Sequence, residues 1–248
     1  MTFRDHFSGH AAAYSRHRPR YPESLFDFVA SLATRRLLAW DCATGNGQSA
    51  EPLARRFERV VATDASERQI ASAIPVANVE YRVAPAEDSR LESESVDLIA
   101  VSQALHWLDF ERFYAEVRRV AAPGAHLAAW AYDLCEVDPA IDEVLGEFYA
   151  ATVGAYWPPE RAWVAERYET IPFPFHELST PSFDMTALWT ADAMLGYVGT
   201  WSAVRRYVAA RGEDPLSILG PALRNAWGEA PKRVRWPLVL KVAAVTPP

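Results

Sequence analysis

The segment between residues 37 and 64 constrains the fold of this chain most, because it combines strand, glycine-loop and helix patterns in one order. A short apolar run leads into Asp41, and a loop with Gly45 and Gly47 follows. Glycines at such a turn let backbone amides approach a ligand closely, and the next apolar residues recur at helical spacing. A second β-rich run ends at Asp64, close to where a βαβ unit carries its ribose-binding carboxylate. The segment therefore predicts a nucleotide site.

Two nucleotide cofactors fit a loop of this kind. The residues from Gly45 to Ala50 satisfy the dinucleotide pattern G-x-G-x-x-G/A, which taken alone fits NAD. Asp41 stands before the loop, and its carboxylate would repel a pyrophosphate but attract the sulfonium and ammonium groups of S-adenosylmethionine. The carboxylate therefore favours S-adenosylmethionine, and an NAD-dependent oxidoreductase is the alternative.

The loop also carries a family resemblance. Residues 41–47 read DCATGNG and resemble the D-x-G-x-G-x-G motif of the class I S-adenosylmethionine-dependent methyltransferases. Ala43 stands where that motif has its first glycine. Because alanine tolerates left-handed backbone poorly, we expect a negative φ at Ala43 and a slightly remodelled cofactor turn.

Further segments resemble one subset of this family, the type 11 methyltransferase domains, which include fungal trans-aconitate methyltransferase. Residues 84–88 (APAED) resemble the adenine-binding turn of the family, and residues 104–110 (ALHWLDF) match the A-x-H-W-x-D-F stretch of the subset. Residues 14–22 (YSRHRPRYP) resemble its Y-x-x-x-R-P-x-Y-P entry motif. Residues 155–157 and 197–203 resemble its substrate-side segments more loosely.

The resemblance implies a set of cofactor-binding residues. Tyr14 and Arg18 are four positions apart, so on a helix they would share a face and could hold the methionine carboxylate. The carboxylates of Asp41 and Asp64 would flank one nucleoside. The expected cofactor-binding residues are Tyr14, Arg18, Asp41, Ala43, Gly45, Gly47, Asp64, Ala86, Glu87 and Gln103.

A second group of residues is expected at the substrate. His106 follows a predicted strand at 95–101, and strand carboxyl ends in open α/β sheets face the ligand crevice. We expect His106 to line the pocket or to act as a base, with a packed core or cap histidine as the alternative. The expected pocket residues are Trp107, Trp157, Tyr197, Trp201 and Arg205, with Arg206 competing for the place of Arg205 and core packing as the alternative for the aromatic residues.

The pattern as a whole predicts an α/β protein. The resemblance implies the Rossmann-like class I methyltransferase fold, a seven-stranded, mostly parallel sheet with one antiparallel strand and helices on both faces. One domain is expected: an N-terminal arm and helix over the cofactor at 1–35, a cofactor-binding core at 36–132, and a substrate cover with the last strands at 133–248. Within that cover we expect one helix through Tyr197 to Val208 and a late antiparallel strand at 234–245.

The resemblance implies an enzyme that transfers a methyl group by in-line displacement to a small molecule. A carboxylic acid such as a trans-aconitate-like compound is the expected acceptor, and because it is ionised at neutral pH it requires no base. A phenol, amine or enol acceptor would need a base, for which His106 is the nearby candidate. A non-catalytic cofactor-binding module is the second alternative.

Composition narrows the partners. The net charge of −7 and the pI near 5.4 argue against nucleic acid, which selects clustered basic faces. Apolar runs are too short to cross a bilayer and the N-terminus has no apolar signal segment, so we expect a cytoplasmic protein without a membrane partner. Cys42 and Cys135 form no C-x-x-C pair, so neither a disulfide framework nor a metal site is expected. The oligomeric state is left open.

Overall fold

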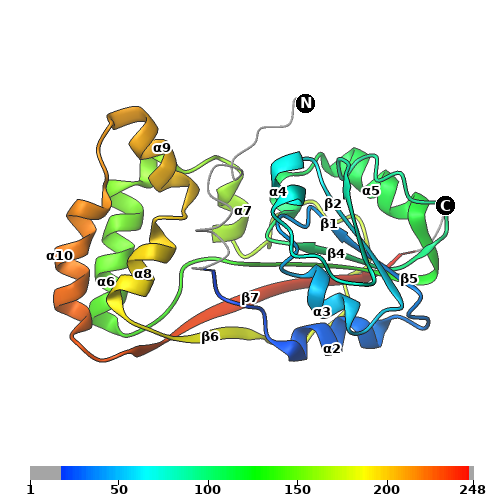
Figure 1. The fold of residues 1–248 in the computed structure, drawn as a ribbon, viewed down its shortest axis with the longest axis horizontal. Helices are drawn as coiled ribbons and strands as arrows, with labels where there is room; N and C mark the ends of the chain where they lie inside the picture. The colour runs from blue at the N-terminus through cyan, green and yellow to red at the C-terminus, as the bar shows by residue number, and fades with distance from the viewer. Residues whose placement is uncertain (1–17, 246–248) are drawn as a thin grey trace.

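The computed structural model of this protein describes residues 18–245. A seven-stranded sheet runs through it, with helices on both faces and a group of helices at one end (Figure 1). The strand order is β3-β2-β1-β4-β5-β7-β6. The strands are β1 (Leu38–Cys42), β2 (Arg59–Asp64), β3 (Val79–Val83), β4 (Val96–Ser102), β5 (Ala121–Tyr132), β6 (Asp184–Trp189) and β7 (Lys232–Ala244).

The sheet has one antiparallel strand, as the sequence analysis predicted. Strands β1 to β5 pair in parallel, whereas β7 runs antiparallel to both β5 and β6. The predicted late strand is thus correct, and it continues through Pro237. Pro237 pairs only with Asp184 of β6, because the pairing of β7 with β5 stops at Leu238. The missing N–H of the proline is therefore not needed on the β5 side.

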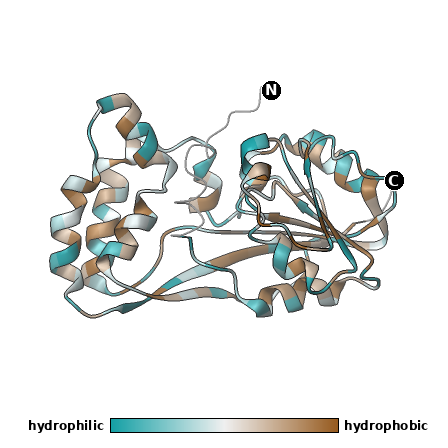
Figure 2. Ribbon diagram, in the orientation of Figure 1, coloured by the Kyte–Doolittle hydropathy of each residue, from teal (hydrophilic) through white to brown (hydrophobic). Residues whose placement is uncertain are grey.

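Alternate side chains of the central strands enter two separate cores, as the period of two in a strand requires. Ala39 and Leu98 pack into the core under α2 (Glu23–Leu32) and α3 (Ala50–Ala54). Trp40 and Ile99, their neighbours in sequence, pack into the core on the other face, under α5 (Phe110–Val120). Figure 2 shows these strands as predominantly apolar between helices of mixed character. Burial on both faces is typical of a parallel sheet.

Two helices begin at Ser66 and Asp109, residue types that favour the N-cap position. The hydroxyl of Ser66 accepts a hydrogen bond from the backbone amide of Gln69 (3.4 Å) and starts α4 (Glu67–Ala71). Asp109 accepts from the backbone amide of Arg112 (3.3 Å) and starts α5. Each cap satisfies an amide that the first helical turn leaves without an intrahelical acceptor.

Most helices after residue 133 gather at one end of the sheet, and α7 lies between this group and the core; together they form a cap (Figure 1). Their bounds are α6 (Pro139–Glu147), α7 (Arg161–Ala165), α8 (Ala191–Val198), α9 (Ser202–Arg211) and α10 (Leu216–Trp227). In this article the name cap refers to these five helices and the short turns between α6 and α7.

The single helix expected through Tyr197 to Val208 is wrong, because the chain breaks it into α8 and α9. The hydroxyl of Thr200 donates to the carbonyl of Tyr197 (2.6 Å), which a continuing helix would offer to the amide of Trp201. The amide of Trp201 donates instead to Val198, and Trp201 itself is extended, with ψ 138°. A side-chain hydroxyl that competes for a helix carbonyl ends the helix here.

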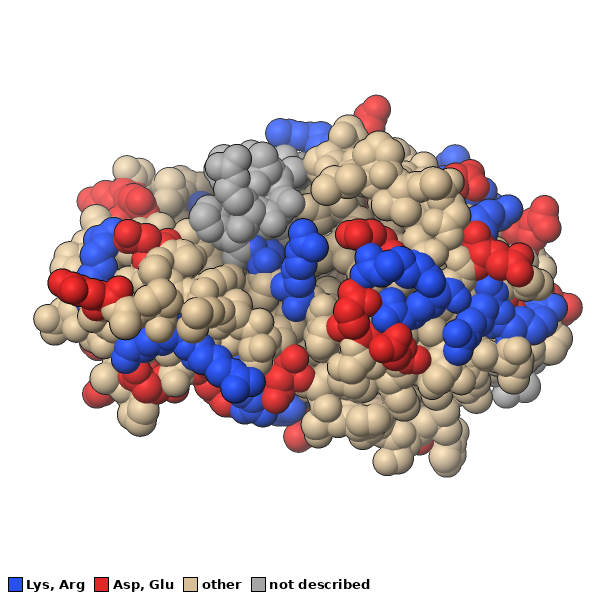
Figure 3. Space-filling model, turned by 60° about the horizontal axis from the view of Figure 1, so that its bottom comes forward, with Lys and Arg blue, Asp and Glu red and all other residues tan. Residues whose placement is uncertain are grey.

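The described surface carries mixed charge. On the face shown in Figure 3, basic side chains lie beside acidic ones. Arg55 and Arg56, for example, pair with Glu23 of α2. Within residues 18–245, no helix is both long and apolar enough to span a bilayer, and no group of three metal-ligating side chains is found.

Candidate active site

The carboxyl edge of the parallel strands collects the predicted site residues. The glycine loop follows β1, Asp64 ends β2, and the 84–88 turn follows β3. Gln103 and the short 3-10 helix Leu105–Trp107 follow β4. Segments far apart in sequence therefore lie along one edge, as open α/β sheets place their ligands. Tyr14 lies outside the described residues.

Asp41 is a fully buried carboxylate at the base of the glycine loop. One oxygen, Oδ2, accepts a hydrogen bond from the hydroxyl of Thr44 (2.5 Å), and the other, Oδ1, is buried with no partner among residues 18–245. Burial raises the pKa of Asp41 to about 7; the Thr44 bond opposes this rise and the charge of Asp64 adds to it. A buried acceptor without a donor suits a ligand that brings a cation or an N–H group, and it disfavours a phosphate.

The expectation of a negative φ at Ala43 is wrong. Ala43 has φ +54°, the left-handed conformation that glycine would adopt without strain. The turn is therefore kept in its glycine-like shape rather than remodelled, and the alanine carries the strain. The bond from the Thr44 amide to the carbonyl of Thr63 (2.9 Å) ties the loop to β2 beside it.

Asp64 holds the loop from the side of β2. Its Oδ2 accepts from the backbone amide of Gly45 (2.9 Å), and its Oδ1 accepts from the amide of Ser66 (2.8 Å). In the next turn, Glu87 accepts from the amide of Asp109 (3.1 Å), which links that turn to the start of α5. Each carboxylate oxygen has a second lone pair, so both groups keep acceptor capacity for a ligand.

Gln103 follows β4, and its side chain bonds the last residue of the neighbouring strand β5. Its side-chain amide donates to the carbonyl of Tyr132 (3.0 Å), and its side-chain oxygen accepts from the amide of the same residue (3.2 Å). The residue itself is left-handed, with φ +52°. A side chain that bonds both backbone groups of Tyr132 fixes the exit of β5 where the pocket begins.

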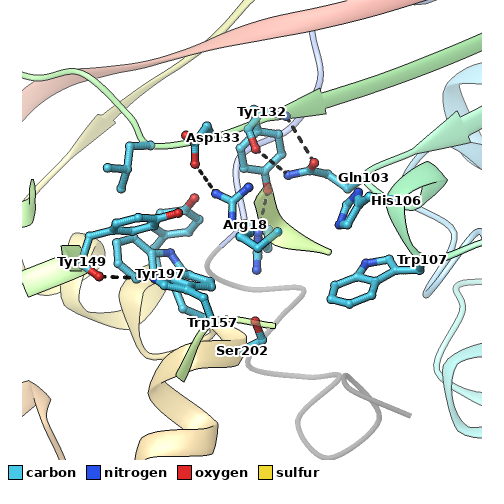
Figure 4. Close-up of a pocket in the computed structure, with 13 residues that line it drawn as sticks. Arg18, Gln103, His106, Trp107, Tyr132, Asp133, Tyr149, Trp157, Tyr197 and Ser202 are labelled. Atoms are coloured by element: carbon cyan, nitrogen blue, oxygen red, sulfur yellow. Dashed lines mark hydrogen bonds and ion pairs between the residues drawn. The ribbon is translucent and has the colours of Figure 1, made fainter. Parts of the chain in front are cut away.

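A pocket with an empty volume of about 560 Å³, partly open to solvent, lies between the sheet edge and the cap (Figure 4). Gln103, His106 and Trp107 lie on its sheet side in Figure 4, opposite aromatic residues of the cap. The lining consists of Arg18, Gln103, His106, Trp107, Tyr132, Asp133, Leu134, Tyr149, Trp157, Arg161, Tyr197, Trp201 and Ser202.

The aromatic residues of the cap form a continuous wall. The ring of Trp157 lies tilted against Tyr149, with 4.7 Å between the ring centroids, and its centroid lies 5.6 Å from that of Trp201. Trp201 meets Tyr197 edge-on at 5.9 Å. Because α8 and α9 are separate helices, Tyr197 and Trp201 meet through this break and not along a shared helix face.

Two arginines and one aspartate carry the charge of the described lining. Arg161 forms an ion pair with Asp133 and lies over the ring of Trp157. Arg18 donates to the hydroxyl of Tyr132 (2.7 Å) and lies over the ring of Tyr197, 5.3 Å from its centroid. Arg18 itself is non-helical, and because Tyr14 lies outside the described residues, its pairing with Arg18 stays a prediction. The described lining thus carries one excess positive charge.

His106 is buried, with 5% of its surface exposed, and its Nδ1 lies 2.8 Å from the hydroxyl of Tyr168. Burial, together with the nearby charge of Arg161, lowers the pKa of His106 to about 3. An imidazole of such low basicity is a poor general base at neutral pH. The geometry supports the pocket-lining alternative over the base.

Several pocket residues were not predicted, and one prediction falls outside the lining. Arg205 is not among the lining residues, and Arg161 is the cap arginine that is. Asp133 directly follows β5, so the rule that selected His106 at the end of a parallel strand also applies to it. The sequence carries no comparable signal for Arg161 or Tyr168.

Fold and site together define a nucleotide-binding α/β enzyme architecture with a capped pocket. Comparison with known proteins identifies the family. A family model described as a methyltransferase domain matches residues 40–129. A Dictyostelium discoideum protein named as a methyltransferase is 33% identical over 229 residues, which cover 91% of this chain and 87% of that protein. An uncharacterized Mycobacterium tuberculosis methyltransferase is 31% identical over 199 residues, covering 79% and 76%. A solved structure from Anaeromyxobacter dehalogenans, described as a type II methyltransferase, is 47% identical, covers 93% of this chain and 99% of that one, and has a TM-score of 0.86.

The chain therefore belongs to the class I S-adenosylmethionine-dependent methyltransferases. The alternative of an NAD-dependent oxidoreductase is wrong. The particular resemblance to trans-aconitate methyltransferase stays a prediction.

Proposed function

We propose that this protein methylates a small carboxylic acid with a flat apolar body. The observation that carries this proposal is the lining of the pocket, in which aromatic walls surround Arg161, the one arginine of the described lining that is not assigned to the cofactor. An aromatic wall favours a planar apolar group, and an arginine favours a carboxylate. One arginine matches a monocarboxylate better than the three carboxylates of trans-aconitate.

The residues at the carboxyl edge fit the cofactor of the family. Asp41 offers a buried, unpartnered oxygen to a cationic group, and Asp64 offers acceptor lone pairs beside the loop, where a ribose hydroxyl would need them. Gly45, Gly47 and Ala43 shape the turn, and S-adenosylmethionine, when bound, supplies an electrophilic methyl group. We assign cofactor binding to these residues together with Arg18, Ala86, Glu87 and Gln103.

The pocket residues position the acceptor. Arg161 would hold a substrate carboxylate while Asp133 and Trp157 fix its guanidinium. The carboxylate is already ionised at neutral pH, so no group of the chain has to remove a proton. Holding the acceptor at attack distance is the main contribution expected of the protein, and such positioning accounts for about 7–11 kcal/mol of barrier in well-oriented reactions.

Radiolabelled methyl transfer to a panel of acids tests the proposal. The panel contains benzoate, cinnamate and trans-aconitate, with the methyl esters of the first two as uncharged controls and phenols and amines as alternative acceptors. We expect turnover of the monocarboxylates, less with trans-aconitate, and none with the esters. Turnover of phenols or amines but no acid would refute the assignment of the acceptor.

The arginine variants make the test specific. Arg161→Gln is expected to raise KM for the acid by about 10-fold or more, as loss of a charge-assisted hydrogen bond does. Arg205→Gln, a cap arginine outside the described lining, is the matched control and is expected to leave KM unchanged. The double variant Arg161→Gln with Asp133→Asn removes the carboxylate that the single variant leaves unpaired, and should recover part of the loss.

Titration with S-adenosylmethionine and S-adenosylhomocysteine separates catalysis from binding alone. Saturable binding without turnover on a broad panel of acceptors would support the alternative of a non-catalytic module. Action in the cytoplasm, where the buried thiols Cys42 and Cys135 would stay reduced, is part of the same proposal.

A further inference from the structure

We propose that His106 is a fixed hydrogen-bond donor that orients the acid substrate through Nε2–H, and that Tyr168 holds it in this tautomer. The donor role rests on the proposed function, since it requires a substrate with an acceptor oxygen. The tautomer does not, because it follows from the contacts of two side chains. Tyr168 is a positioning residue that acts through His106.

The two ring nitrogens of His106 have different neighbours: Nδ1 faces Tyr168, and Nε2 is left for the pocket. Tyr168 is fully buried and is not among the pocket-lining residues, and it takes Nδ1 at 2.8 Å. His106 does line the pocket. Nε2 is therefore the ring nitrogen left to reach a substrate.

The single hydroxyl proton of Tyr168 decides which ring nitrogen of His106 carries a hydrogen. The hydroxyl of Tyr168 has one proton to donate, and its oxygen lies 2.8 Å from Nδ1 of His106. Within residues 18–245, Nδ1 of His106 is the one acceptor found for that proton. A buried hydroxyl without an acceptor is costly, so the hydroxyl donates to Nδ1 and the ring carries its own proton on Nε2.

The charge around the ring keeps it neutral. The charged groups that line the same pocket are Arg18, Asp133 and Arg161, and Asp133 is already paired with Arg161. Burial and Arg161 both lower the pKa of His106, and burial raises the pKa of Tyr168. The tyrosine therefore stays a donor and the imidazole stays an acceptor at Nδ1 across the physiological pH range.

The backbone of Tyr168 indicates that this contact is enforced. Arg167 and Tyr168 are consecutive non-glycine residues with φ +53° and +59°, and they end the segment that carries Arg161. Each left-handed residue of this kind costs about 1–3 kcal/mol and persists only where the surrounding structure holds it in that conformation. The amide of Tyr168 bonds the carbonyl of Trp163 (2.7 Å), so the turn places the hydroxyl beside His106.

A donor suits methylation of a carboxylate better than a base does. A hydrogen bond to one carboxylate oxygen leaves the other oxygen as the nucleophile and fixes the plane of the group. In the step itself, an electron pair of the free oxygen forms the new O–CH₃ bond, and the S–CH₃ bond breaks with its electrons returning to sulfur. His106 donates its hydrogen bond throughout and gives up no proton.

Nitrogen-15 NMR of the histidine rings tests the tautomer without an acceptor substrate. In the full chain labelled with ¹⁵N-histidine and saturated with S-adenosylhomocysteine, His106→Gln assigns the resonances of His106. We expect a neutral ring with the proton on Nε2 that does not titrate between pH 5 and 8. In Tyr168→Phe we expect the Nδ1–H form to gain population. A proton on Nδ1 in the unaltered protein, or a titration in that range, would overturn the proposal.

Two substitutions of His106 distinguish loss of the hydrogen-bond donor from loss of side-chain volume. The amide of Gln can place an N–H near the position of Nε2, whereas the shorter Asn places its amide near Nδ1. With cinnamate as the probe, we expect His106→Asn to lower kcat/KM by about 10- to 100-fold, as loss of one hydrogen bond to a charged group does. His106→Gln should keep most of the activity, and circular dichroism checks that both variants fold.

The outcomes distinguish this proposal from the proposed function. Equal loss in the two His106 variants would overturn the donor role. The NMR result stands or falls independently of turnover, so failure of cinnamate and every other acid as substrates would refute the acceptor class while leaving the tautomer measured.

Discussion

Replacing Asp41 by Asn is expected to stabilise the ligand-free protein at pH 8 and to weaken binding of S-adenosylmethionine. The carboxyl has a pKa of about 7 in the folded chain, against an ordinary value of 3.8. Because the folded value is the higher one, the buried carboxyl costs no stability below about pH 4. Its ionisation then costs progressively more as the pH rises to about 7, and the cost is constant above that.

The size of the effect follows from the pH range between the ordinary pKa of the carboxyl and its pKa in the folded chain. Each unit of pKa difference corresponds to about 1.4 kcal/mol, so between pH 5 and pH 8 the unaltered protein loses about 2–3 kcal/mol that the Asn variant does not lose. The amide of Asn can still accept the bond from Thr44. Its NH₂ group faces the side where Oδ1 has no partner, and that cost, about 1–3 kcal/mol, is the same at both pH values.

Urea unfolding of both proteins at pH 5 and pH 8 measures the difference. The advantage of the variant in free energy of unfolding should grow by about 2–3 kcal/mol from the lower to the higher pH. Titration calorimetry at pH 8 should show weaker S-adenosylmethionine binding. A difference in stability that is equal at both pH values would refute the reasoning, since the burial of an ionised carboxylate would then not be its origin.

Substitutions at three further positions probe both edges of the sheet: Ala43 and Gln103 lie at the carboxyl edge of the parallel strands, and Asp97 lies at the amino end of β4. Ala43→Val should lower the free energy of unfolding by about 1–2 kcal/mol in urea titration, because a β-branched residue fits φ +54° worse than alanine, whereas Ala43→Gly should not. Gln103→Glu places a carboxylate against the carbonyl of Tyr132 and should lower the melting temperature, with Gln103→Met separating charge from lost hydrogen bonds. Asp97→Ala leaves the buried amide of Leu38 without its acceptor (3.1 Å) and should cost about 1–3 kcal/mol in the same titration.

The cofactor half of the fold could be predicted because its signals are local. The apolar runs that form buried strands, such as the one before Asp41, and the helix caps at Ser66 and Asp109 each depend on a few neighbours in sequence. The seven-stranded, mostly parallel sheet and its antiparallel last strand came from the family resemblance. The backbone at Ala43 was predicted wrongly because a preference of one residue was set against a loop fixed by several hydrogen bonds, and the loop prevailed.

The cap could be predicted less well, because its contacts are long-range. The helix break after Tyr197 depends on the hydroxyl of Thr200, which competes with an ordinary helix pattern and leaves no distinct period in the sequence. Arg161 reaches the pocket lining through its pairing with Asp133, and Tyr168, which lies outside the lining, contacts His106, 62 residues earlier in the chain. Periodicity cannot indicate pairs that only tertiary packing brings together.

The long strand β7 has a consequence for how ligands enter and leave. It pairs with β5 in the core along residues 238–244 and with β6 along residues 232–237, on the side of the chain that leads into the cap. One continuous run of backbone hydrogen bonds therefore joins the two halves of the molecule, and no flexible joint lies in this strand. A hinge that swings the two halves apart would have to break that ladder. Cofactor and product are thus expected to exchange by local rearrangement of the segments around the pocket, while the sheet stays intact. The same separation lets the sequence of the cap vary, and with it the acceptor, without a change in the cofactor site.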